Sequence, residues 1–334
     1  MQVNELFRQS NTILLDGGMG TMLQAAGLKL GARPEELNIT DPALIEGIHA
    51  QYAAAGSRIV NANTFGASAH KLAGSAYTLE QVIAAGIANC KRACAPYGAL
   101  TALDVGPLGE LLEPSGTLAF EDAVAEYARI VKAGEAAGAD LIFFETYTDL
   151  YELKAALLAA KENTHLPILA SMSFEAGGRT FTGCTVESFA ATARGLGADA
   201  VGINCSLGPK EIFPMAKRLA EAVPGNFPVF VKPNAGLPRA DGSGYDITPQ
   251  LFALQMKPYR ELHLFAAGGC CGTTPEFIKL LSGTFAGCTP GRPAHRMPSV
   301  LCTPVDTVTV DGITVVGERI NPTGKKRFQQ ALRE

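Results

Sequence analysis

The chain has 334 residues, of which 47% are hydrophobic and 18% are charged, and its formal net charge is −4. This composition is typical of a globular protein and excludes a disordered or fibrous one. The small negative charge argues against a nucleic-acid partner, because phosphate binding requires a dominant basic surface.

Targeting and membrane segments are not evident in the sequence. No stretch approaches the ~18 consecutive apolar residues of a membrane span, and the N-terminus lacks the charged-then-apolar order of a signal peptide. We therefore expect a cytoplasmic protein without membrane contacts. In that compartment thiols stay reduced, so the eight cysteines are expected to be buried, catalytic or metal-bound rather than paired.

Short runs rich in β-branched and apolar residues alternate with longer Ala-rich amphipathic stretches, a pattern typical of repeated β-α units. The predicted strands cover residues 12–16, 58–61, 100–104, 141–145, 168–172, 200–204, 229–232 and 264–267. The predicted helices cover about 42–55, 79–95, 118–138, 149–161, 186–197, 209–222, 248–257 and 275–282. Eight such units favour a (β/α)8 TIM barrel, and an open doubly wound sheet is the alternative.

Polar side chains fall at or just after the carboxyl ends of these strands. They are Asp16, Asn61, Asn63, Asp104, Glu145, Ser171, Ser173, Asn204, Lys232 and Asn234. Any one of them could be a turn or cap residue. Together they favour the barrel, because barrel enzymes keep their catalytic groups at that end of the sheet.

The pattern changes after the last predicted helix. Residues 1–290 are predicted to form the barrel, and the proline-punctuated residues 291–315 a linker or wrapping segment. Asp311-Gly312 lies between β-branched runs and predicts a hairpin turn there, followed by the start of a helix at FQQALRE.

Three cysteines are predicted to converge at the barrel mouth. Cys270 and Cys271 are adjacent, and a disulfide between neighbours is strained, while the flanking glycines let both sulfurs point to one centre. Cys205 follows the sixth strand, so it approaches the same mouth. The alternative is a set of buried inert thiols. We assign no role to the other five, Cys90, Cys94, Cys184, Cys288 and Cys302.

Three cysteine ligands leave one tetrahedral position of a zinc ion open, as in catalytic sites. Zinc with three thiolates carries a net charge of −1, so it is a weak Lewis acid but can keep a fourth thiol deprotonated. The expected reaction class is therefore alkyl transfer to a substrate thiol.

A glycine-rich segment follows the first strand. Asp16, Gly17, Gly18 and Thr21 belong to a loop whose free N–H groups suit a carboxylate, and Leu23 stands where a dinucleotide fingerprint needs its third glycine. Glu145 and Asp16 could hold an ammonium group, although Glu145 could instead be a helix cap beside Thr146. A loop that binds an anion, carboxylates that bind an ammonium group and a zinc ion that binds a thiol together predict a thiol amino acid as the ligand.

The motifs DGGMGT, NANTFGAS, FFET, GINCS, VKPNAG and GGCCGT, in this order over about residues 10–290, resemble the homocysteine S-methyltransferase family. The resemblance implies a TIM barrel, zinc on Cys205, Cys270 and Cys271, and homocysteine as the next ligand. It also implies that the substrate carboxylate lies on the Asp16–Thr21 loop and its amino group on Glu145. Asn234 resembles a residue that can fill the fourth zinc position when substrate is absent.

Members of this family use different methyl donors. Free-standing enzymes use betaine, S-methylmethionine or S-adenosylmethionine, and the first module of cobalamin-dependent methionine synthase uses methylcobalamin. Residues 316–326, VGERINPTGKK, are similar to the opening of the methyltetrahydrofolate-binding barrel of that synthase. We therefore expect residues 316–334 to begin a truncated pterin-binding domain, with cobalamin-binding and folate-binding modules outside this chain. The alternatives are a free-standing methyltransferase and a non-catalytic zinc- or thiol-binding module.

Overall fold

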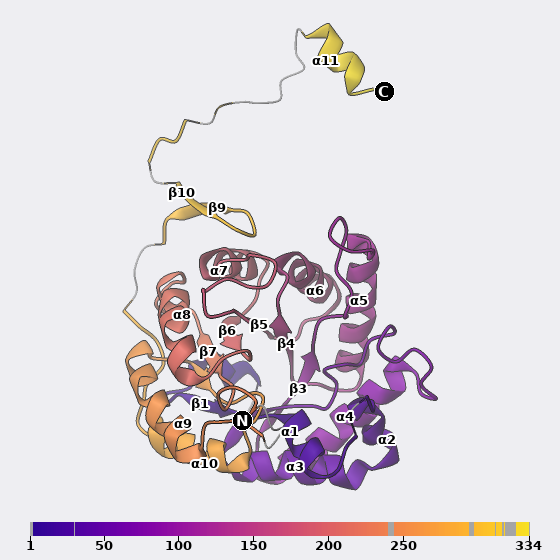
Figure 1. The fold of residues 1–334 in the computed structure, drawn as a ribbon, viewed down its shortest axis with the longest axis vertical. Coiled ribbons are helices and arrows are strands. Elements are labelled where there is room, and N and C mark those ends of the chain that lie inside the picture. The colour runs from indigo at the N-terminus through magenta and orange to yellow at the C-terminus, as the bar shows by residue number, and fades with distance from the viewer. Residues whose placement is uncertain are drawn as a thin grey trace.

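The fold is seen in a computed structural model that describes residues 3–29, 31–239, 244–293, 297–310, 312–315, 317 and 325–333. Eight strands close into one parallel barrel in chain order, and helices surround it (Figure 1). The predicted (β/α)8 barrel is confirmed, and the open sheet is excluded because β1 pairs with both β2 and β8.

All eight predicted strands are present, with small shifts at their ends. They are β1 (Ile13–Leu15), β2 (Ser57–Asn61), β3 (Leu100–Val105), β4 (Leu141–Tyr147), β5 (Ile168–Met172), β6 (Ala200–Asn204), β7 (Val229–Lys232) and β8 (Ala266–Ala267). Nearly every strand residue is buried, because the barrel interior covers one face of the sheet and the helices cover the other.

The eight predicted helices are also present. They are α3 (Pro42–Ala54), α4 (Leu79–Cys94), α5 (Phe120–Ala136), α6 (Leu150–Asn163), α7 (Val186–Gly195), α8 (Pro209–Glu221), α9 (Pro249–Met256) and α10 (Pro275–Thr284). The sequence did not predict α1 (Met19–Ala25), α2 (Leu37–Thr40) or the 3-10 helices η1 (Val3–Arg8), η2 (Pro34–Glu36), η3 (Ala95–Tyr97) and η4 (Lys257–Leu262). These elements are short, so they carry little of the periodicity by which helices are recognised.

Two apolar cores hold the barrel together. The larger one lies between the strands and the helices, and the smaller one fills the barrel interior. In the interior the rings of Phe143 and Phe230 meet edge to face with centroids 5.0 Å apart. Leu6 of η1 joins this interior cluster, so the N-terminal segment adds a side chain to the core below the site.

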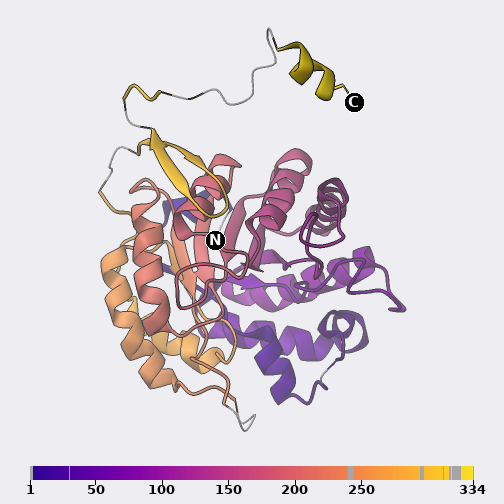
Figure 2. The same cartoon turned by 45° about the horizontal axis from the view of Figure 1, so that its top comes forward.

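A small antiparallel sheet of β9 (Ser299–Cys302) and β10 (Thr307–Val310) follows the barrel. The sequence placed the hairpin turn at Asp311-Gly312, of which Asp311 lies outside the described residues. The predicted hairpin is wrong, since β10 pairs with the preceding strand β9 and residues 312–315 form no strand. The sheet lies beside the barrel (Figure 2). It is anchored to α7, because Ser188 Oγ donates to the Asp306 carbonyl at 3.2 Å. The helix predicted at FQQALRE is present as α11 (Lys326–Ala331).

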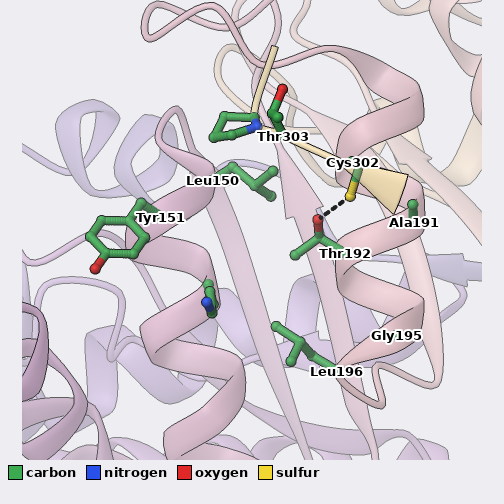
Figure 3. A pocket seen from close by; sticks show the side chains of 10 residues that line it. Leu150, Tyr151, Ala191, Thr192, Gly195, Leu196, Cys302 and Thr303 are labelled. Carbon is green, nitrogen blue, oxygen red and sulfur yellow. Dashed lines mark hydrogen bonds between the residues drawn. The ribbon is translucent and has the colours of Figure 1, made fainter. Parts of the chain in front are cut away.

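A groove lies between α6, α7 and β9, on the outer wall of the barrel. Thr192 Oγ1 and Cys302 Sγ lie 3.4 Å apart across it, and Leu150, Tyr151 and Leu196 line its sides (Figure 3). Among the described helices, none is long and apolar enough to cross a membrane.

Candidate metal centre and substrate pocket

A cavity of about 350 Å³ opens at the carboxyl ends of the strands. The residues singled out in the sequence that line it are Asp16, Gly17, Gly18, Thr21, Asn61, Asn63, Asp104, Glu145, Cys205, Lys232, Cys270 and Cys271. Ser171, Ser173, Asn204 and Asn234 are not among the lining residues, although all four are buried beside it. Residues from seven strand ends, all except that of β5, thus share one pocket.

Three thiols form a cluster in this pocket. The sulfur atoms of Cys205, Cys270 and Cys271 all lie within 4.8 Å of one another, and the Cys205 and Cys271 sulfurs are 3.8 Å apart. In a tetrahedral site with Zn–S bonds of about 2.3 Å, two ligand sulfurs are about 3.8 Å apart. The donor set and its spacing therefore fit a thiophilic metal such as zinc.

The backbone at Cys205 is unusual. Cys205 and Ser206 both have φ near +62°, in the left-handed region that side chains other than those of glycine and asparagine rarely adopt. The Cys205 N–H donates to the Lys232 carbonyl at 3.1 Å, which holds the turn against the end of β7. This turn follows directly after β6, and Cys205 lies on the cavity wall.

Cys270 and Cys271 lie on a loop that hydrogen bonds fix on both sides. The Cys270 N–H donates to the Pro233 carbonyl at 2.9 Å, and the Cys271 N–H donates to Asn234 Oδ1 at 3.0 Å. A Cβ atom at Gly269 would lie 2.3 Å from Thr273 Oγ1, so only glycine fits this close approach. Asn234 therefore orients the Cys271 backbone, and its predicted place as a fourth metal ligand stays a prediction.

The thiols influence one another's protonation. Hydrogen bonds with Cys205 and Cys270 lower the pKa of Cys271, and hydrogen bonds with Cys270 and Cys271 raise the pKa of Cys205. Tyr245, which the sequence did not single out, lies half-buried against this cluster and lines the cavity. Burial and the charge of Cys271 raise the pKa of its phenol, so Tyr245 is a neutral hydroxyl beside the thiols.

A buried ion cluster lies next to the thiols. Lys232 Nζ is 3.0 Å from both Asp16 Oδ1 and Glu145 Oε2, and the lysine side chain is only 3% exposed. The backbone N–H of Asn61 donates to Asp16 Oδ2 at 2.7 Å, and Asn61 Nδ2 donates to Glu145 Oε2 at 3.4 Å. The sequence placed Lys232 at the mouth, but only the structure shows that it joins the two carboxylates.

Burial controls the charges in this cluster. It raises the pKa of Glu145 to about 7, although Lys232 opposes the shift, and it raises the pKa of Asp16 in the same way. Burial by itself disfavours a charged lysine, but the attraction of Asp16 and Glu145 outweighs it and raises the pKa of Lys232. The lysine therefore stays charged, and Glu145 can change its charge near neutral pH.

Glu145 is not a helix cap, so that alternative is wrong. The N-cap of α6 is Asp149, whose side chain accepts the Tyr151 N–H at 2.9 Å. The backbone turns directly after Glu145, since Thr146 has φ of +68°. Asn204 fixes this turn, accepting the Thr146 N–H at 2.9 Å and donating to Thr146 Oγ1 at 2.7 Å.

The glycine-rich segment is a loop that turns into a helix. Gly18 is the N-cap of α1, and Met19, Gly20 and Thr21 form the first turn on the cavity wall. First-turn N–H groups have no partner within their own helix, so they suit an anion. Thr21 Oγ1 accepts the Gly272 N–H at 2.9 Å, which ties this turn to the cysteine loop.

This combination of a closed barrel, a three-thiol cluster and a carboxylate-lined pocket agrees with the sequence comparison. The chain belongs to the homocysteine S-methyltransferase family, a family of methyltransferase enzymes, whose model matches residues 13–285. Its curated relatives include the methionine synthase of Mycobacterium tuberculosis, which is 33% identical over 343 residues. That match covers 95% of this chain and 28% of the relative, so the chain spans less than a third of that protein's length.

Solved structures show the same architecture. The homocysteine methyltransferase MmuM from Escherichia coli in its oxidized form matches with a TM-score of 0.73 and 23% identity, covering 84% of this chain and 98% of that one. Its metallated form matches with a TM-score of 0.69 and 24% identity, covering 84% and 99%. At sequence identities of 23% and 24%, this similarity is evidence for the fold alone.

Proposed function

We propose that this chain catalyses zinc-dependent methyl transfer to the thiol of homocysteine, giving methionine. The observation that carries the proposal is the cluster of Cys205, Cys270 and Cys271 sulfurs within 4.8 Å of one another, in the same cavity as the buried ion cluster. Membership of the homocysteine S-methyltransferase family supports this assignment.

In this proposal the three cysteines hold the metal. When bound, zinc on three thiolates supplies a site at which a substrate thiol loses its proton at neutral pH. The chain's own residues prepare that site: Asn234 and the Pro233 carbonyl hold the cysteine loop by its amides. The donors in these hydrogen bonds are the backbone N–H groups of the cysteines. The bonds therefore fix the direction of the sulfurs without competing for the sulfur lone pairs.

The remaining lining residues would orient the amino acid. The first turn of α1, from Met19 to Thr21, offers N–H groups for the substrate carboxylate. Glu145, at the end of β4, is the proposed partner of its ammonium group, as the family resemblance implies. Binding at both ends of the substrate would direct its thiol toward the cysteines.

The methyl donor is the finer part of the proposal. A methionine synthase is a curated relative, and the match covers only 28% of its length, which supports methylcobalamin held by another module as the donor. We further propose residues 1–290 as the homocysteine-binding barrel, 291–315 as a linker and 316–334 as the start of a pterin-binding domain. Residues 316, 318–324 and 334 of that last segment lie outside the described residues.

A donor panel tests the proposal. The zinc-loaded protein is incubated with homocysteine and, separately, with methylcobalamin, S-methylmethionine, S-adenosylmethionine or betaine, and methionine is quantified. We expect turnover with methylcobalamin. Turnover only with a sulfonium or with betaine would overturn the donor assignment and make the protein a free-standing methyltransferase. Homocysteine binding without proton release, and no turnover with any donor, would favour a non-catalytic thiol-binding module.

A further inference from the structure

Both carboxylate oxygens of Asp16 are already engaged by other groups of the protein. Its Oδ1 atom lies 3.0 Å from Lys232 Nζ, and its Oδ2 atom accepts the Asn61 N–H at 2.7 Å. Both contacts are buried and one is charge-assisted, so exchanging them for a substrate ammonium would leave another buried group unpaired. Asp16 is thus already used by the protein itself.

Asp104 presents the opposite case. It lies near the end of β3, lines the cavity and is only 7% exposed, yet its Oδ1 atom is buried and has no hydrogen-bond partner among the described residues. A buried carboxylate oxygen without a partner is costly, and native proteins rarely keep one unless a ligand, an ion or water supplies the partner.

The pocket also has more acidic than basic side chains. Asp16, Glu145, Asp104 and Glu35 are the four acids among the cavity-lining residues that the structure describes, and Lys232 is the basic one. Lys232 contacts the first two and not the third. Burial and the nearby charge of Glu145 raise the pKa of Asp104, an effect that a cation entering between these two carboxyl groups would offset.

We propose that Asp104 and Glu145 together bind the ammonium group of the amino-acid substrate, and that Asp16 acts as a positioning residue through Lys232. Glu145 contributes the oxygen that does not contact Lys232, since both contacts recorded for its side chain are made through Oε2. Asp104 then determines that the site takes a thiol carrying an α-ammonium group rather than a plain thiol acid. This inference rests on the proposed function, because it takes homocysteine as the substrate.

The test compares two thiols that differ only in the ammonium group, L-homocysteine and 4-mercaptobutanoic acid. Their dissociation constants are measured by titration calorimetry on the zinc-loaded protein, for the wild type, Asp104→Asn and Glu145→Gln. Asp140→Asn is the matched control, because it makes the same change in a carboxylate that precedes β4 at the other end of the barrel and accepts the Thr101 N–H at 2.8 Å.

We expect Asp104→Asn to weaken homocysteine binding by about tenfold or more, the cost of a charged hydrogen bond, and to change 4-mercaptobutanoic acid binding by less than about twofold. Glu145→Gln should behave similarly, and Asp140→Asn should change neither affinity. Equal losses for both thiols in Asp104→Asn, or no loss for homocysteine, would overturn the role of Asp104 and leave the proposed function standing. A wild-type protein that binds neither thiol would overturn the proposed function and this inference with it.

Discussion

The sulfur atoms of Cys205 and Cys271 lie 3.8 Å apart although 66 residues separate them in the chain. Cys205 follows β6 and Cys271 follows β8, and β7 lies between these two strands in the barrel. The two thiols meet because parallel strands end at the same mouth of the barrel, and the turns that carry Cys205 and Cys271 both line the cavity there. A change to either turn or either thiol should therefore act on the whole cluster.

Replacing Cys271 by alanine should abolish stable metal binding, because two thiolates and water hold zinc far more weakly than three thiolates. The measurement is the zinc content per chain after dialysis against a chelator. Cys302→Ala is the control, since Cys302 is a free, exposed cysteine on β9. Equal zinc retention in the wild type and in Cys271→Ala would contradict the assignment of the thiol cluster.

Replacing Lys232 by methionine should destabilise the protein by about 3 kcal/mol near pH 8, because it leaves two buried carboxylates without their cation. The pKa of Glu145 is already raised to about 7, and losing Lys232 raises it further. An acid whose pKa is raised on folding loses stability as pH rises, so the deficit should shrink toward about pH 5.

Urea unfolding of Lys232→Met and wild type at the two pH values measures this difference. Lys161→Met serves as the control, because Lys161 is an exposed residue on α6. If the deficit is the same at both pH values, the buried carboxylates do not change protonation as we infer.

His49 should make the protein sensitive to acid. Its side chain is fully buried on α3, neither ring nitrogen has a hydrogen-bond partner in the part of the chain that the structure describes, and burial lowers its pKa from 6.5 to about 3. Between these values the unfolded state binds a proton that the folded state does not, so stability falls as pH drops. The loss from this one group is about 2 kcal/mol at pH 5.

His49→Leu should therefore flatten the dependence of unfolding free energy on pH between about pH 4 and pH 7. His165→Leu is the comparison, because it makes the same substitution at an exposed position. A slope that survives in His49→Leu would assign the acid sensitivity to other groups.

Gly202 is a packing requirement of the barrel interior. A Cβ atom at this position of β6 would lie 2.3 Å from the Phe230 ring, so Gly202→Ala should cost about 1–3 kcal/mol of unfolding free energy. Gly47→Ala is the matched substitution at an exposed position of α3, where an added Cβ atom meets nothing within 4 Å. This substitution should stabilise the helix by about 1 kcal/mol. Thermal unfolding of both variants should show shifts of opposite sign, and a neutral Gly202→Ala would show that Phe230 can move aside.

The barrel and the thiol cluster could be predicted because both follow from local patterns. Strand and helix periods alternate along the chain, and GINCS and GGCCGT place cysteines directly after two strands whose ends must meet at one mouth. The hairpin at β9 and β10 could not be predicted correctly. Asp311-Gly312 carries the stronger local turn signal, while the observed turn is stabilised by contacts of the Asp306 region with α7.

The sequence by itself determined which side chains reach the mouth of the barrel, since their position after a strand is enough to place them there. Only the tertiary structure decided how they pair. Lys232 pairs with both Asp16 and Glu145, and Asp104 has an oxygen without a partner among the described residues. The register and closure of the barrel set these distances of a few ångströms between strands distant in the chain. Charge pairing in a buried pocket depends on those distances, and no local pattern encodes them.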